Sequence, residues 1–192
     1  MKIELWYHEK INPQIKDSWE KYFKDVDEVK IINGDICEAK VDAIVSPANS
    51  YGFMRGGLDG VLTKRFGYHV SRRIQHLLIE EYGRELLIGE ALSVETDDEI
   101  CPNIICAPTM IVPMDVSKTI NVYLSTRAAL VEADLNGFES IAISAMGLGV
   151  GQVPPEICAR QMRKAYDDFL GVWEMPSNLD VAHAEYYKLI VE

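Results

Sequence analysis

The stretch VDAIVSPANSYGFMRGGLDG, residues 41–60, decides which class of fold the chain adopts. It opens with a short apolar run that includes β-branched residues, which is typical of a buried strand. Asn49 and several glycines follow, and residues that favour a helix resume at Leu58. A strand that continues through a glycine-rich loop into a helix is typical of α/β proteins, in which such loops bind ligands. The stretch therefore indicates an α/β fold, in which the loop after this strand is either a glycine-rich surface loop or a ligand-binding loop.

The rest of the chain shows the same alternation. Strands are expected at residues 2–8, 29–33, 42–46, 90–96, 103–108 and 140–146, and helices at 13–24, 58–65, 68–82, 119–136 and about 155–170. Gly83 and Gly137 are placed to end two of these helices. Near residues 183–191 the pattern is weaker and fits a short helix or strand. The order β-α-β-β-α-β-β-α-β-α predicts one domain, residues 1–192, with a mixed sheet covered by helices.

The charge balance argues against two kinds of partner. The formal net charge is −11, so a broad electrostatic attraction to nucleic acid is disfavoured and direct nucleic-acid binding is not expected. An anionic ligand would have to be held by backbone amides rather than by a basic field. No apolar run approaches the roughly 20 residues that cross a bilayer, and the N-terminus shows no hydrophobic signal, so no membrane association is expected.

The cysteines and histidines form no pattern typical of a metal site. Cys37, Cys101, Cys106 and Cys158 include no CxxC pair and no tight cluster with histidine, which argues against a zinc site and against a disulfide scaffold. We expect them to be buried free thiols in a reducing compartment. The histidines form no HExxH motif. The sequence therefore predicts a cytoplasmic protein with no metal and no other cofactor.

Three loops of unusual composition follow predicted strands: NGDI (33–36), the stretch 46–60, and GLGVGQVPP (147–155). If those strands run parallel, the loops lie together at one edge of the sheet. In the third loop, Gly147, Gly149 and Gly151 alternate before a helix start, so the backbone can present successive N–H groups to a phosphate. The spacing is neither the GxGxxG fingerprint nor a Walker A motif, and a plain glycine turn remains an alternative.

Three polar residues in the first two loops are candidates for chemistry. Asn49 can donate and accept hydrogen bonds, and Asp59 can hold a water or act as a weak base. The spacing alone favours a helix cap or a first-turn charge for Asp59 over a chemical role. Asp35 can accept a hydrogen bond from an amino group such as the adenine amine, or it can be a turn residue after Gly34.

Taken together, these segments resemble the macrodomain family of ADP-ribose-binding modules. The resemblance is carried by NGDI, VDAIVSPANS, MRGGLDGVL, LLIGEALSV, IICAPTM and SAMGLGVGQVPPE, in the family's order, and it includes the step from Asn49 to Asp59. It runs from about residue 29 to 170. It implies a three-layer α/β/α macrodomain-like mixed sheet flanked by helices, with an extra N-terminal β-α unit (1–28) and a C-terminal tail (171–192).

The resemblance also implies roles for individual residues. Asp35 would recognise the adenine amine, with Ile36 beside it. Asn49 would contact the distal ribose, and Asp59 would orient or activate a water near the anomeric carbon, which makes Asn49 and Asp59 the catalytic candidates. The other positions implied to line the distal ribose and the diphosphate are Gly56, Gly57, Leu58, Gly147, Leu148, Gly149, Val150 and Gly151.

The leading hypothesis from this resemblance is metal-independent hydrolysis of an ADP-ribose derivative, either an ADP-ribosyl–protein bond or ADP-ribose 1''-phosphate. The partner would then be ADP-ribose or an ADP-ribosylated substrate. The alternative is a non-catalytic reader of ADP-ribose or a related nucleotide signal. A nicotinamide-dependent oxidoreductase has little support, because the GxGxxG spacing is absent. The chain departs from the family pattern at Ser46, Pro47, Met54, Arg55, Leu148 and Val150.

Overall fold

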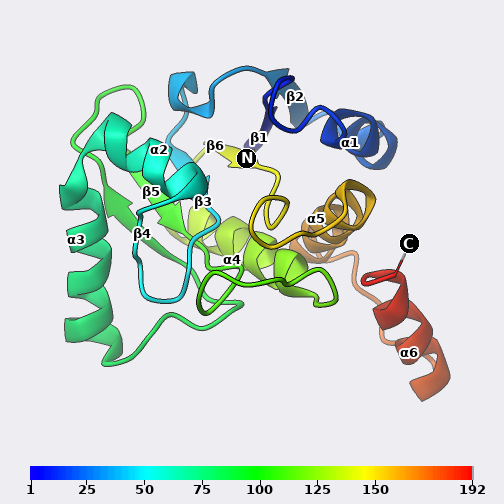
Figure 1. Cartoon of the computed structure of the whole chain (residues 1–192). Coiled ribbons are helices and arrows are strands. Elements are labelled where there is room, and N and C mark those ends of the chain that lie inside the picture. Colours follow the sequence, from blue (N-terminus) through cyan, green and yellow to red (C-terminus); the bar gives the residue numbers. More distant parts are fainter. Residues whose placement is uncertain (192) are drawn as a thin grey trace.

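The computed structural model describes residues 1–191, which form a six-stranded sheet flanked by helices (Figure 1). The strands are β1 (Lys2–Tyr7), β2 (Val29–Asn33), β3 (Ala43–Ser46), β4 (Leu92–Glu95), β5 (Asn103–Cys106) and β6 (Ser140–Ser144). The helices are α1 (Ile15–Phe23), α2 (Gly57–Phe66), α3 (Tyr68–Leu77), α4 (Asn121–Leu135), α5 (Pro155–Phe169) and α6 (Leu179–Lys188). Two shorter segments are the 3₁₀ helix η1 (Ile36–Glu38) and the π-helix η2 (Leu78–Tyr82). The predicted elements are therefore confirmed, with small shifts at their ends.

The strand order across the sheet is β2-β1-β6-β3-β5-β4. Neighbouring strands from β2 to β5 pair in parallel, and β4 pairs antiparallel with β5. The prediction of a mixed sheet is thus confirmed. Because β2, β3 and β6 run parallel, their carboxyl ends lie at the same edge, which is the condition for the three predicted loops to lie together.

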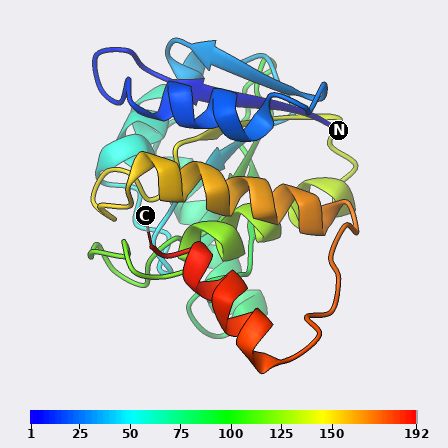
Figure 2. The same cartoon turned by 90° about the vertical axis from the view of Figure 1, so that its right-hand side faces the viewer.

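Two apolar cores hold the helices against the two faces of the sheet. On one face, Val45 of β3 belongs to the same buried cluster as Trp19 of α1 and Leu130 of α4. On the other face, Ile44 of β3 belongs to a cluster with Ile74 of α3. Figure 2 shows α1 and α5 side by side over the first of these faces. Burial on both faces explains why the central strands are continuous apolar runs, and the three-layer α/β/α architecture is confirmed.

The predicted helix over residues 68–82 changes its geometry near its end. α3 is regular as far as Leu77, and the chain continues in the wider π-helical turn η2. The turn ends at Gly83, whose φ is +60°. Glycine adopts this left-handed conformation at low cost, so the predicted stop at Gly83 is confirmed. Gly137 ends α4 in the same way, with φ +68°.

The two ends of the chain are attached differently. β1 lies inside the sheet between β2 and β6, so the N-terminal β-α unit supplies an interior strand. The segment predicted as a short helix or strand is a helix, α6, and none of its residues is buried. Its C-terminal end is held to α5 by side chains: Arg160 Nη1 donates to the carbonyls of Lys188 and Val191, and Gln161 Nε2 donates to the carbonyl of Leu189 at 2.7 Å.

All four cysteines are free thiols, as predicted. Cys101, Cys106 and Cys158 are buried, but Cys37 is only half-buried, which corrects the expectation of four buried thiols. Burial raises the pKa of Cys158 to about 12. Within residues 1–191, no helix has both the length and the apolar character that a membrane crossing requires.

Candidate functional site

The loops after β2, β3 and β6 leave the sheet at one edge. Figure 1 shows the cyan loop after β3 and the yellow loop after β6 in front of the sheet. A further loop, residues 107–116 after β5, joins these two. The N–H of Ser50 donates to the carbonyl of Met110 at 3.1 Å, and the N–H of Val116 donates to the carbonyl of Gly151 at 2.9 Å. The candidate site is therefore built from four loops, three of which are joined by backbone hydrogen bonds, and sequence reasoning singled out the loops after β2, β3 and β6.

The loop after β6 is closed on itself. Gly147 is buried with φ +74°, and a Cβ built there would lie 2.9 Å from Val122 and 3.0 Å from Val153. A Cβ at Gly151 would lie 2.5 Å from the carbonyl oxygen of Gly147. Gly149, by contrast, is exposed and has open space around its Cβ position. Gly147 and Gly151 thus allow the chain to cross itself, and this turns the middle of the loop outward.

This loop contains backbone N–H groups that have no hydrogen-bond acceptor within residues 1–191, and those of Gly149 and Val150 belong to exposed residues. Within residues 1–191, the N–H groups of residues 147–151 find no hydrogen-bond acceptor; the loop's internal bonds come from Gln152 and Val153. Pro155 then begins α5, with Pro154 as its N-terminal cap. A row of free N–H groups next to a helix N-terminus favours an anion. This geometry favours the phosphate interpretation of the loop over a plain glycine turn.

In the loop after β3, the side chain of Asn49 fixes the backbone. Its Oδ1 accepts from the N–H groups of Tyr51 at 3.2 Å and Phe53 at 3.3 Å, and its Nδ2 donates to the carbonyl of Phe53 at 2.8 Å. Asn49 is half-buried at the carboxyl edge of the sheet. In this structure it shapes residues 49–53, with one N–H of its amide left for another partner.

The same loop is anchored on α2 and α3. Ser71 Oγ donates to the carbonyl of Gly52, and Thr63 Oγ1 donates to the carbonyl of Met54, both at 2.8 Å. The Met54 side chain is buried in the core between the sheet and α2 and α3. This burial gives a physical reason for methionine where the family pattern has glycine. Residues 55–57 after this anchor are exposed, and Gly57 has φ +55° with open space around it.

Asp59 lies in the first turn of α2 but is not a solvated helix-start charge. Its side chain is buried, and its Oδ1 accepts a hydrogen bond from the hydroxyl of Ser46, the fully buried last residue of β3. Burial raises the pKa of Asp59 to about 6, although the bond from Ser46 acts in the opposite direction. The Asp59 charge also adds to the effect of burial in raising the pKa of Cys106, at the end of β5. Asp59 therefore points toward the ends of β3 and β5.

Asp35 follows β2 and is exposed. One of its oxygens accepts from the N–H of Cys37 at 2.9 Å, which caps the short helix η1. The turn role predicted from Gly34 and Asp35 is therefore present, and the second oxygen has no partner within residues 1–191. The neighbouring Ile36 side chain is buried in the core, so only its backbone faces the loop.

The remaining predicted positions also lie at this edge. Leu58 is half-buried at the start of α2, Leu148 is half-buried against the core, and Val150 is exposed. The loop after β5 adds three exposed apolar side chains that sequence reasoning missed: Ile111, Val112 and Met114. The signal was present, because TMIVPMDV is unusually apolar for a segment between a strand and a helix. Within residues 1–191, no cluster of three His, Cys, Asp or Glu side chains could hold a metal ion.

The sequence matches known proteins over the same segment. A family model described as Macro domain matches residues 45–162. An uncharacterised protein of Aquifex aeolicus is 38% identical over 135 residues, covering 70% of this chain and 78% of the relative. An uncharacterised protein of Aeropyrum pernix is 34% identical over 142 residues, covering 73% of this chain and 71% of the relative.

Solved structures agree on the fold. A variant of the Oceanobacillus iheyensis macrodomain with ADPR superposes with a TM-score of 0.63 at 22% identity, covering 71% of this chain and 75% of that chain. The same macrodomain with ADP gives 0.63 at 22% identity, with 73% and 75% covered. The macrodomain of Mycobacterium tuberculosis DarG gives 0.62 at 20% identity, with 71% and 88% covered.

Proposed function

Because the chain belongs to the macrodomain family, we propose that it binds ADP-ribose at the sheet edge formed by the loops after β2, β3 and β6. The observation that carries this proposal is the row of N–H groups at residues 147–151 without an acceptor in residues 1–191. Backbone donors of this kind hold a diphosphate without basic side chains, which suits a chain of net charge −11. The Oceanobacillus iheyensis structures with ADPR and ADP support the same ligand.

In this proposal each loop contacts a different part of the ligand. The diphosphate lies against residues 147–151, where Leu148 and Val150 contribute their N–H groups alongside the glycines. Asp35 accepts the adenine amine with the oxygen that Cys37 does not use, beside the backbone of Ile36.

The distal ribose lies against the loop after β3. Gly56 and Gly57 are exposed, with open space at their Cβ positions, so a ligand can approach their backbone closely. Leu58 lies directly after them, and Asn49 is proposed to contact the ribose with the amide N–H that its own loop leaves free.

We propose that the site hydrolyses an ADP-ribose derivative, either an ADP-ribosyl–protein bond or ADP-ribose 1''-phosphate, without a metal. A water oxygen bonds to the anomeric carbon, the bond from that carbon to the leaving group breaks, and the water's proton passes to the leaving group. Asp59 is proposed to orient this water. With a pKa of about 6 its side chain is mostly ionised at neutral pH, which is the form that accepts a hydrogen bond from water.

A non-catalytic reader is the second candidate, and one observation favours it. The side-chain amide of Asn49 makes three hydrogen bonds to the backbone of its own loop, and Asp59 is buried against Ser46. Neither of the two proposed catalytic side chains is fully exposed. A site built this way can bind ADP-ribose without turning a derivative over.

Calorimetry with ADP-ribose, run beside turnover assays on an ADP-ribosylated protein and on ADP-ribose 1''-phosphate, separates the two candidates. The hydrolase predicts turnover that Asp59→Asn removes while ADP-ribose binding persists. Binding with no turnover of either substrate would establish the reader. Turnover that survives in both Asp59→Asn and Asn49→Ala would refute the assigned mechanism.

We also propose a cytoplasmic location and no direct contact with nucleic acid. The free thiols fit a reducing compartment. The net charge of −11 opposes association with a polyanion. The partner is then ADP-ribose itself or a protein that carries it.

A further inference from the structure

Two adjoining hollows lie between the loop after β3 and the helix pair α3–η2. The first, of 380 Å³, is lined by Met54 and Arg55 from the loop and by Tyr68, Ser71 and Arg72 from α3. The second, of 530 Å³, is lined by Tyr51, Leu78, Ile79 and Arg84, among others. Phe53 and Gln75 line both, so the two hollows form one depression, which we call the α3 groove.

The α3 groove is separate from the proposed ADP-ribose site but shares a wall with it. Asp35, Asp59 and residues 147–151 line neither hollow. The common wall is the loop of residues 51–57. Gly56 and Gly57 are proposed to line the distal ribose, and the groove is lined by Tyr51, Phe53, Met54 and Arg55. The Ser71–Gly52 hydrogen bond and the buried Met54 hold this loop on α3 and α2. The wall is therefore held in place by contacts within the chain.

The charges of the first hollow favour an anionic occupant, whereas the second hollow is also lined by the carboxylate of Glu85. Arg55 and Arg72 are exposed, and neither has an ion-pair partner within residues 1–191. Other arginines nearby are neutralised: Arg65 pairs with Asp98, Arg73 with Asp97 and Arg84 with Glu90. Two unpaired guanidinium groups attract one or two carboxylates at short range. A long polyanion, in contrast, would meet the repulsion of a chain with net charge −11.

The groove also offers apolar surface. Tyr51, Phe53, Tyr68 and Ile79 are 42%, 49%, 72% and 70% exposed. The Tyr51 and Phe53 rings lie 6.4 Å apart, and the Arg55 guanidinium carbon lies 5.5 Å from the centre of the Phe53 ring. Tyrosine, phenylalanine and arginine together are the side chains enriched where proteins bind other polypeptides.

From these observations we propose that the α3 groove binds an acidic peptide segment with an apolar side chain, namely the part of a substrate polypeptide that adjoins its ADP-ribosylated residue. Peptide binding follows from the groove itself, whereas the identity of the peptide as a substrate segment rests on the proposed function. The two unpaired arginines hold the carboxylates, and the aromatic side chains cover the apolar residue.

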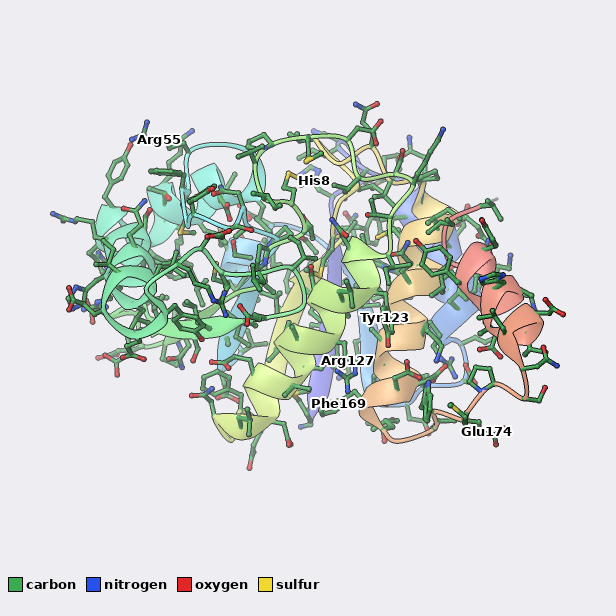
Figure 3. The ribbon with its side chains drawn as sticks, turned by 90° about the horizontal axis from the view of Figure 1, so that it is seen from below. His8, Arg55, Tyr123, Arg127, Phe169 and Glu174 are labelled. Carbon is green, nitrogen blue, oxygen red and sulfur yellow. The ribbon has the colours of Figure 1, made fainter. Side chains whose placement is uncertain are left out.

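Fluorescence anisotropy with a short fluorescein-labelled peptide, a phenylalanine and a leucine flanked by glutamates, tests this proposal. We expect Arg72→Glu and Arg55→Glu each to weaken binding by roughly fivefold to tenfold, because an attraction becomes a repulsion. Arg127→Glu is the matched control: Arg127 is also exposed and has no ion pair within residues 1–191, but it lies on α4. Figure 3 shows Arg55 at the end of the molecule formed by α2 and α3, with Arg127 away from it on α4.

The outcomes separate the groove from the ADP-ribose site. Calorimetry should give the same ADP-ribose affinity for Arg72→Glu and the unmodified chain. If the peptide binds but ADP-ribose does not, the proposed function fails and the groove stands as a peptide site. No peptide binding, or equal weakening by Arg127→Glu, overturns the groove proposal while leaving ADP-ribose binding intact. Binding of a short oligothymidylate in place of the peptide, abolished by Arg72→Glu, overturns it in favour of nucleic acid.

Discussion

The hydroxyl of Ser46 donates a hydrogen bond to the carboxylate of Asp59, and both side chains are buried where β3 ends and α2 begins. Serine is one of the points at which this chain departs from the family pattern. The hydrogen bond gives a physical reason for serine at this position, because the bond partly offsets the rise in the pKa of Asp59 that burial causes. Ser46 thereby keeps a larger fraction of Asp59 ionised at neutral pH.

The first prediction concerns the stability cost of this buried carboxylate. The pKa of Asp59 is raised from 3.8 to about 6, so the folded state binds the proton more tightly than the unfolded state does. Stability therefore falls as pH rises from about 4 to 6, by roughly 3 kcal/mol. Asn has no titratable group, so the stability of Asp59→Asn does not fall with pH for this reason. In urea unfolding, we expect the variant to gain stability relative to the unmodified chain between pH 4 and pH 7.5.

Asp134→Asn serves as the control for this comparison, since Asp134 is exposed on α4 and its side chain has no hydrogen bond within residues 1–191. Its stability relative to the unmodified chain should change little between the two pH values. A stability difference between Asp59→Asn and the unmodified chain that stays constant over this pH range would show that the Asp59 pKa is not raised.

The second prediction concerns the pH dependence of turnover. Ser46→Ala removes the bond that lowers the pKa of Asp59, so this pKa rises further above its value of about 6. If ionised Asp59 orients the water, the acid limb of the pH–rate profile moves to higher pH. Activity at pH 6 then falls more than activity at pH 8. An acid limb at the same pH in both proteins would mean that Ser46 does not tune Asp59.

A third prediction tests the glycine loop after β6. Gly147→Ala forces a side chain into a left-handed backbone and within 2.9 Å of Val122, so the loop must move and its N–H groups with it. We expect ADP-ribose affinity in calorimetry to fall by at least about tenfold, since hydrogen bonds to a charged group are lost. Gly137→Ala is the control. It imposes a similar backbone strain, at φ +68°, but its Cβ would have no atom within 4 Å, and Gly137 precedes β6 instead of following it. Equal affinities for the two variants would remove the loop from the binding site.

A fourth prediction separates packing from backbone strain in the loop after β3. Gly52 and Gly83 have similar φ values, +66° and +60°. A Cβ at Gly52 would lie 2.5 Å from Ile74, whereas nothing lies within 4 Å of one at Gly83. Chemical denaturation should therefore show a loss of about 2 to 4 kcal/mol for Gly52→Ala and about 1 kcal/mol for Gly83→Ala. Similar losses for both would mean that the loop is not fixed on α3.

Much of the fold could be predicted because its signals are local. The alternation of short apolar runs with helical spacing is enough to give the strands and the helices. The meeting of three loops at one edge could be predicted only on the condition that their strands run parallel. The stops at Gly83 and Gly137 follow from backbone preference alone. The position of β1 between β2 and β6 could not be predicted in this way, because strand order depends on packing between distant segments.

The candidate site was predicted less completely, because its chemistry depends on contacts across the sequence. Asp59 can be read from its position as a helix-start charge, and only the packing of α2 against the sheet shows that it is buried against Ser46. Met54 looks like an interruption of a glycine run, but its side chain fills the core. The α3 groove joins residues 51–55 to residues 68–85, which no local pattern connects.

The most direct test of ADP-ribose binding is a titration followed by NMR of the backbone amides. The proposed site predicts that the amide signals of residues 147–151, which have no acceptor within residues 1–191, shift on addition of ADP-ribose and become protected from exchange. Signals of Asp35, Gly56 and Gly57 should move at the same ligand concentrations. Binding that leaves the amides of residues 147–151 unmoved, or no binding at all, would contradict the account.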